Sequence, residues 1–191
     1  VVLIVINFAP VISLELGYFL KHINAPDISK EQETMDFLSD NSDLGDFALY
    51  IPKIEAKTLV VANVDPFNAN EYNGALTKGV AHAKGTALPG INGNTFLFAH
   101  SGRNYYDGIH MNVQFYLLEK LEPFDRIYIK YQGQLYIYEV SALKKVWPDE
   151  ITYLSDQQFA YNKLTLMSCW PAGINYQRQL VEAKLIEVKP L

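Results

Sequence analysis

A single cysteine, Cys169, ends the apolar run 164–169 and is followed by Pro171 and Gly173. Because proline cannot donate to a strand ladder and glycine permits a turn, a strand through this run must stop just after the thiol. A strand-like pattern resumes at Arg178. If the two strands pair antiparallel, their ends lie about 5 Å apart, and the guanidinium can reach the space in front of the sulfur. A thiol beside a guanidinium is an arrangement that can stabilise a thiolate or an oxyanion.

A cysteine nucleophile also needs a group that accepts and returns its proton. Of the four histidines, His100 ends the apolar run 95–99 at a strand-to-loop junction, where catalytic groups are often presented. His82 lies in a polar stretch, residues 79–85, which we expect to be a loop. On residue type alone, a histidine is more often structural or at the surface, and Cys169 could equally be a buried apolar thiol.

The elements that must position these groups are short apolar strands separated by turn residues. Gln132-Gly133 predicts a tight hairpin, and residues 181–185 alternate as in a strand with one wet face. Helical spacing predicts a helix over 113–121 with Asn112 as its N-cap, and a second short helix is expected over 71–78. We expect strands at residues 47–51, 58–63, 95–100, 125–131, 135–146, 163–169 and 178–188. Mostly antiparallel strands with two or three short helices predict a mostly β fold, a closed or nearly closed β-barrel.

Composition excludes several other classes of protein. The 191 residues suit one domain plus a short extension, and 49% apolar against 19% charged residues disfavours disorder. The net charge of −5 argues against nucleic acid as the main partner, because phosphate binding needs clustered basic residues. With one cysteine, neither an internal disulfide, a cysteine-rich zinc site nor an iron–sulfur cluster is possible.

The amino-terminal part differs from the rest of the chain. Residues 1–14 are strongly apolar, fall short of the roughly 20 residues of a membrane-spanning helix, and begin with Val1 rather than Met. We interpret residues 1–20 as the outer end of an N-terminal membrane anchor; the alternative is an amphipathic or buried helix of a soluble protein. A secretory signal is disfavoured because no basic region precedes the apolar run. Residues 21–46 carry seven acidic side chains after position 26, which predicts an exposed linker, and residues 47–191 form the expected barrel domain.

The order of these motifs resembles the sortases, transpeptidases that attach proteins to bacterial cell walls. The sortase signature is TLxTC followed by an arginine on the next strand; Thr165, Leu166 and Cys169 match it, and Ser168 stands where the family usually has threonine, which preserves a hydroxyl. Further resemblances are Ala99-His100-Ser101, with alanine replacing the glycine of the family's G-H-[RS] segment, IPKI at 51–54 and GTALPG at 85–90. The resemblance covers residues 47–188 and implies a sortase-like closed β-barrel of about eight strands. The spacing from Cys169 to Arg178 is closer to the class C, D and E branches than to class A, whose loop is longer.

The resemblance also implies roles. Cys169 would be the nucleophile, His100 the general acid and base, and Arg178 the group that stabilises the oxyanion or positions the substrate. Thr165, Ser168 and Ser101 are expected to contact the substrate. The implied substrate is a secreted protein with an LPXTG-like sorting signal, and the acyl-enzyme thioester would be resolved by an amine of a peptidoglycan precursor or a pilin lysine. The implied location is the bacterial membrane, with the catalytic domain outside the cell.

Two other functions stay open on the sequence: a cysteine peptidase of the same fold that releases its product to water, and a non-enzymatic surface barrel in which Cys169 is merely buried. We expect no cofactor. Asp107 and His110 could hold a cation such as calcium, but their spacing is not specific for a metal. Asp65-Pro66-Phe67 resembles the lid motif of pilin-polymerising sortases but follows the IPKI segment, so we interpret it as a turn. Loops 101–111 and 147–156 are expected to set specificity.

Overall fold

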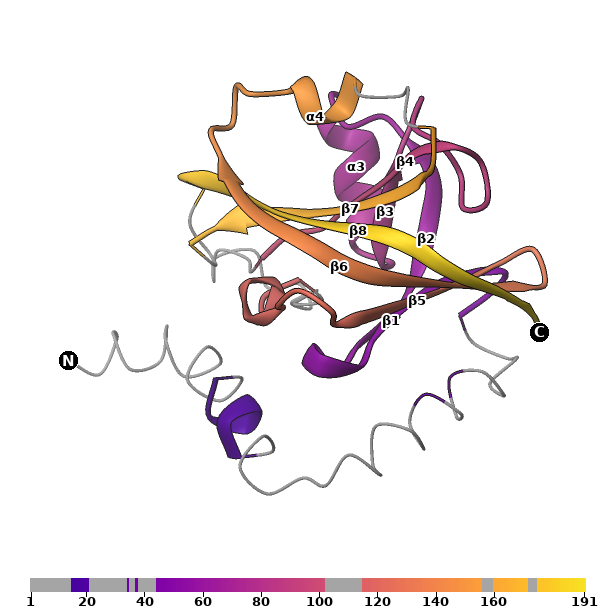
Figure 1. The fold of residues 1–191 in the computed structure, drawn as a ribbon. Helices are drawn as coiled ribbons and strands as arrows, with labels where there is room; N and C mark the ends of the chain where they lie inside the picture. Colours follow the sequence, from indigo (N-terminus) through magenta and orange to yellow (C-terminus); the bar gives the residue numbers. More distant parts are fainter. Residues whose placement is uncertain are drawn as a thin grey trace.

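The computed structural model describes residues 15–20, 34, 37, 44–101, 115–155, 160–171 and 175–191. Eight strands within these ranges close into a barrel (Figure 1), which confirms the predicted fold class. Around the barrel the strands follow the order β1-β2-β3-β4-β7-β8-β6-β5. They are β1 (Phe47–Ile51), β2 (Ala56–Val64), β3 (Val80–Ala83), β4 (Gly93–Phe98), β5 (Arg126–Tyr131), β6 (Gln134–Val146), β7 (Asn162–Trp170) and β8 (Gln177–Pro190).

Six of the eight strand pairs are antiparallel, as expected, but β2 with β3 and β4 with β7 are parallel. Parallel neighbours need a crossover, and between β2 and β3 the helix α3 (Ala69–Leu76) supplies it. Asn68 caps α3 by accepting a hydrogen bond from the Glu71 amide at 3.3 Å. The predicted helix over 71–78 is therefore present, shifted by two residues toward the N-terminus.

Two expectations about local structure were wrong. The stretch 79–85 is not a polar loop, because residues 80–83 form the fully buried strand β3. In the described part of 113–121, a turn at 115–117 leads only into the short 3-10 helix η3 (Leu118–Lys120). The buried side chains of Phe115 and Leu118 face the core, so their apolar spacing reflects packing rather than a regular α-helix. The N-cap predicted at Asn112 lies outside the described residues.

The hairpin between β5 and β6 is present as predicted. Gln132 and Gly133 have φ values of 49° and 71°, and Tyr131 pairs with Gln134 across the turn. Positive φ at both central residues is the geometry that suits the right-handed twist of paired strands. The alternation predicted at 181–185 is also present, since Val181 and Ala183 are buried whereas Lys184 is exposed.

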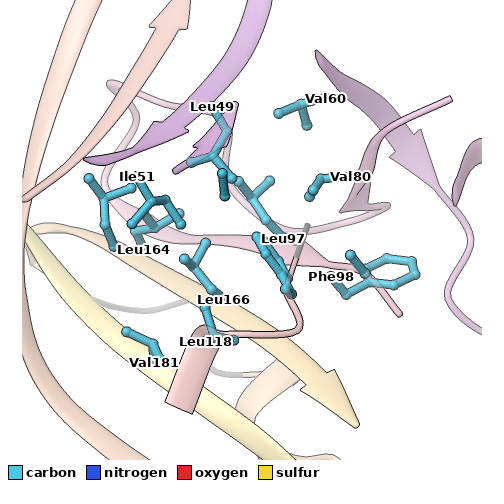
Figure 2. Close-up of a cluster of buried hydrophobic side chains, with 14 of the residues drawn as sticks. Leu49, Ile51, Val60, Val80, Leu97, Phe98, Leu118, Leu164, Leu166 and Val181 are labelled. Atoms are coloured by element: carbon cyan, nitrogen blue, oxygen red, sulfur yellow. The ribbon is translucent and has the colours of Figure 1, made fainter. Parts of the chain in front are cut away.

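The barrel interior is filled by aliphatic side chains that alternate with those of the outer face. In Figure 2, Leu97 of β4, Leu164 and Leu166 of β7, and Val181 of β8 converge with Leu49 and Ile51 of β1. Leu118 of η3 reaches the same cluster from the barrel mouth. Side chains along a strand alternate between its two faces, so Thr165, Met167 and Cys169 lie on the opposite face of β7 from Leu164 and Leu166.

Part of the amino-terminal region contacts the barrel. Phe37 is fully buried against Tyr50 of β1, with a ring separation of 5.2 Å, and Lys130 Nζ lies 4.7 Å from the centre of its ring. Glu15 forms a 3.1 Å ion pair with Lys120 of η3. No helix within the described ranges has the length and apolar character needed to cross a membrane. The apolar run 1–14 and most of the expected linker 21–46 lie outside the described residues.

Candidate active site

Antiparallel pairing of β7 with β8 brings the predicted thiol and guanidinium together. Cys169 and Arg178 are direct partners in the ladder, so their side chains leave the sheet on the same face. Arg178 Nη1 donates toward Cys169 Sγ over 3.7 Å. The proximity that the strand pattern predicted is therefore present.

The parallel pairing of β4 with β7 brings the segment that ends in His100 next to the strand that carries Cys169. Phe98 pairs with Met167, and the ladder continues with the amide of Ala99, which donates to the Met167 carbonyl at 3.1 Å. Extending this register by two residues, beyond the end of β4, predicts that His100 lies beside Cys169. Neighbouring strands lie about 4.8 Å apart, so one row of side chains crosses three strands. We call His100, Cys169 and Arg178 the thiol row.

The face that carries the thiol row is lined by two helices. Tyr72 of α3 packs edge-on against Phe98, with ring centres 6.4 Å apart. Tyr153 of α4 (Thr152–Ser155) stacks on Phe96 at 5.6 Å. In Figure 1, α3 and α4 lie on the same side of β7 and β8. Both helices therefore cover the part of this face that precedes His100 along β4.

Two amide side chains that the sequence analysis did not single out contact the row. Asn73 of α3 places Oδ1 3.4 Å from His100 Nε2. Asn175, in the loop before β8, accepts a hydrogen bond from Arg178 Nη1, and its Oδ1 lies 3.7 Å from Cys169 Sγ. Amides carry no charge and fit no catalytic spacing rule, so the only signal for Asn175 was its position three residues before Arg178.

Burial and charge act on the thiol in opposite directions. Burial raises the pKa of Cys169, and the guanidinium of Arg178 lowers it by a smaller amount, so the pKa lies above its ordinary value. The thiol is therefore protonated at neutral pH in the unliganded protein. Burial also raises the pKa of Tyr153, while the charge of Arg178 lowers it and that of Cys169 raises it. Tyr153 is thus electrostatically coupled to the thiol row from the predicted specificity loop 147–156.

The three residues expected to contact substrate are all buried. Thr165 is 1% exposed, and its hydroxyl donates to Asn94 Oδ1 at 2.8 Å, so it ties β7 to β4. Ser168 is 2% exposed and faces away from Cys169, since neighbouring residues of a strand point to opposite faces. Ser101 is also 2% exposed, directly after His100. Substrate contact by these hydroxyls stays a prediction, and Thr165 has an internal partner that such contact would have to displace.

His82 has a different environment from His100. It is fully buried in β3, and its Nδ1 accepts a hydrogen bond from the Asn63 amide at 3.2 Å. Its Nε2 therefore carries the proton and donates to the Ala87 carbonyl at 3.1 Å, with Thr86 Oγ1 at 3.0 Å. Burial lowers the pKa of His82, so the ring is neutral. Its hydrogen bonds are those of a structural histidine.

Two further predictions concerned the Asp65-Pro66-Phe67 segment and a possible cation site at Asp107 and His110. Asp65 Oδ1 accepts a hydrogen bond from the Phe67 amide at 2.9 Å, which confirms that Asp65-Pro66-Phe67 is a turn, between β2 and α3. Asp107, His110 and nearly all of loop 101–111 lie outside the described residues. Within the described ranges, no group of three or more histidine, cysteine, aspartate or glutamate side chains is arranged to hold a metal ion.

Comparison with known proteins decides the family. The Sortase domain family matches residues 49–186, which include the whole thiol row. This chain belongs to the sortase family. Sortases are cell-surface-associated enzymes, and membership supports an enzyme with transpeptidase or cysteine-protease-like activity. No curated protein sequence matches the chain significantly.

Solved sortases of several classes share the fold. The pilus-related sortase C of Group B Streptococcus is 29% identical, with a TM-score of 0.62 over 77% of this chain and 70% of that one. Sortase C-1 from Actinomyces oris is 26% identical, with a TM-score of 0.62 over 86% and 89%. The Clostridium perfringens sortase D5 transpeptidase is 25% identical, with a TM-score of 0.60 over 92% and 99%. These neighbours agree with the class C, D and E resemblance read from the spacing, although class A sortases match as well.

Proposed function

We propose that this sortase cleaves an LPXTG-like sorting signal through a thioester on Cys169 and transfers the cleaved protein to an amine. The acceptor is an amino group of a peptidoglycan precursor or a pilin lysine, and the enzyme acts at the outer face of the bacterial membrane. The single observation that supports this most is the thiol row: one nucleophile, one proton carrier and one fixed positive charge on adjacent strand ends.

Acylation follows from the roles of these three groups. His100 takes the thiol proton as Cys169 Sγ attacks the carbonyl carbon of the scissile threonine–glycine bond, and a carbon–sulfur bond forms. The carbonyl oxygen becomes an oxyanion, which Arg178 stabilises with N–H donors, a contribution of a few kcal/mol in comparable sites. The carbon–nitrogen bond then breaks, and His100 returns the proton to the leaving amine. A neutral thiol in the unliganded protein fits this order, because the proton leaves only when a substrate is present.

Resolution of the thioester repeats the same steps with a new amine. The incoming amine loses a proton to His100 and attacks the thioester carbonyl, and the carbon–sulfur bond breaks. The sulfur leaves as a thiolate and regains its proton from His100. Each cycle exchanges one amide for another and consumes no water, which separates a transpeptidase from a peptidase.

Intact-protein mass spectrometry tests the acylation step. The enzyme is incubated with a panel of sorting-signal peptides, and we expect a mass increase equal to the amino-terminal acyl fragment, located on Cys169. The Cys169→Ala variant, with the same peptides, is the matched control and should show no adduct. Absence of any adduct across the panel, with Cys169 open to alkylation in the folded protein, would contradict the proposal.

Adding an amine acceptor distinguishes a transpeptidase from the alternative, a peptidase of the same fold. Product is measured with and without added glycine peptides or lysine-containing peptides. A transpeptidase forms a new amide in proportion to the amine, whereas a peptidase of the same fold gives the free acid at a rate that the amine does not change. A non-enzymatic barrel would form neither product.

A further inference from the structure

The donor and acceptor groups around Arg178 Nη1 are not matched in number. This nitrogen carries two N–H groups. Three acceptors surround it: Cys169 Sγ at 3.7 Å, the Gln177 carbonyl at 3.3 Å and Asn175 Oδ1 at shorter range. Gln177 is the neighbour of Arg178 in the chain, so its carbonyl stays in place. The sulfur and Asn175 therefore compete for the remaining N–H group.

We propose that Asn175 is a positioning residue that holds Arg178 beside the protonated thiol and gives up this N–H when a substrate carbonyl enters. The role in acylation rests on the proposed function. Asn175 Oδ1 accepts from Arg178 and, over 3.7 Å, from the Cys169 thiol, so it favours the neutral form of the sulfur. Once the sulfur has lost its proton, the guanidinium has a stronger acceptor than an amide oxygen in the thiolate or the oxyanion.

The location of Asn175 suits such an exchange. Its side chain is exposed and lies in the loop between β7 and β8, whereas Arg178 is fixed in the β8 ladder opposite Cys169. Asn175 is therefore more open to solvent than the half-buried guanidinium that it contacts. Displacing one amide oxygen at an exposed site costs little, because water can replace the lost bond.

The described groups that influence the titration of the thiol are few. Arg178 of β8 lowers the pKa of Cys169, and burial raises it. Tyr153 of α4 is coupled to both residues, and His100 follows β4, the strand that pairs with β7. Asn175 adds no charge to this set. Its replacement by aspartate therefore changes one charge in an otherwise constant environment.

The test measures the pH midpoint of Cys169 alkylation in the folded full chain, together with the acylation rate with a sorting-signal peptide. Asn175→Ala should lower the midpoint by about half to one pH unit, because the thiol loses an acceptor and the thiolate gains an N–H donor. Asn175→Asp, nearly equal in shape, should raise the midpoint by about one unit or more, since its carboxylate pairs with Arg178 and repels the thiolate. Asn92→Asp, one residue before β4 begins, is the matched control and should leave the midpoint unchanged.

Acylation should fall about tenfold in Asn175→Ala, although more thiolate is present, and about 10²-fold in Asn175→Asp. Equal midpoints in wild type and both variants, or a rise in Asn175→Ala, would overturn the assignment, as would full acylation in Asn175→Asp. If no peptide acylates the wild type, the proposed function fails, and the alkylation midpoints still decide whether Asn175 sets the state of the thiol.

Discussion

Two rows of side chains on the same three strands have opposite characters. The thiol row crosses β4, β7 and β8 at one end, and a second row, Phe96, Thr165 and Glu182, crosses the same strands four residues earlier along β7. We call the second the threonine row. At about 3.3 Å per residue the two rows lie roughly 13 Å apart, and both are built on one hydrogen-bonded ladder.

The polar side chains of the threonine row bind partners that lie on strands or on helix α4. Thr165 donates to Asn94, and Asn94 Nδ2 donates to the Tyr153 carbonyl at 3.2 Å. Glu182 accepts from Lys163 at 2.8 Å and pairs with Lys144 at 2.9 Å. Burial raises the pKa of Glu182, but the two lysines outweigh burial and hold it below its ordinary value. The polar side chains of the threonine row are therefore already paired within the protein.

The thiol row has partners that a substrate can replace. The contacts to Cys169 Sγ are 3.7 Å long, and one of them comes from the loop residue Asn175. His100 lies beyond the end of β4, and its Nε2 is 3.4 Å from Asn73 Oδ1. In both rows the strand ladder fixes where the side chains lie. Chemistry is possible only where the strands end and the partners are exchangeable.

Arg178 offers the largest expected effect. If its N–H groups are directed at an oxyanion, Arg178→Lys should be nearly as damaging as Arg178→Ala, with acylation reduced by about 10² to 10³ in both, because an ammonium lacks the fixed fork of the guanidinium. The measurement is the transpeptidation rate, with circular dichroism to verify folding. Retention of most activity in Arg178→Lys would show that only the positive charge matters, and near wild-type rates in Arg178→Ala would remove Arg178 from the mechanism.

Variants of the two histidines distinguish a role in proton transfer from a role in stability. His100→Ala should lower turnover by about 10², the scale of general acid–base catalysis. His82→Ala should change the turnover of the folded fraction only a few-fold but lower the free energy of unfolding by about 2 to 4 kcal/mol, through lost buried hydrogen bonds and a cavity. Turnover and urea denaturation of both variants provide the check. Equal losses of turnover, with both proteins folded, would mean that the proton partner is wrongly assigned.

The pH dependence of alkylation tests the balance of burial and charge at Cys169. Because burial outweighs Arg178, the alkylation rate should rise with pH through a midpoint above about 8.5, the ordinary value for cysteine. Arg178→Ala removes the positive charge that lowers the pKa of Cys169, so the midpoint of this variant should lie higher still. A wild-type midpoint well below 8.5 would show that the guanidinium dominates and that the thiolate exists before substrate arrives.

Thr165 should have the smallest effect on activity. Thr165→Val removes the donor to Asn94 Oδ1 and leaves a buried acceptor unpaired, so the free energy of unfolding should fall by about 1 to 3 kcal/mol while acylation stays within a few-fold. Thr165→Ser keeps the hydroxyl and is the matched control. A loss of acylation beyond tenfold in Thr165→Val, with stability unchanged, would make Thr165 a substrate contact instead.

Much of the fold and two members of the thiol row could be predicted from local patterns. The strand predicted at 163–169, the proline after the thiol and the strand beginning at Arg178 suit an antiparallel pair, and the structure shows that pair with Cys169 opposite Arg178. The Gln132-Gly133 turn was predictable for the same reason: its conformation depends on two adjacent residues and the strands they join.

Features that depend on contacts between distant segments of the chain could not be predicted from local sequence patterns. The strand β3 is short and fully buried, so it lacks the alternation that marks a half-buried strand, and His82 within it was misplaced in a loop. The contacts of Asn73 and Asn175 follow from the packing of α3 and the course of the loop before β8. The protonation state of the Cys169 thiol depends on how far the effect of burial on its pKa exceeds that of the Arg178 charge. Residue types and spacing therefore reveal which groups can react, whereas packing sets their protonation and their partners, because desolvation and hydrogen bonding act through space rather than along the chain.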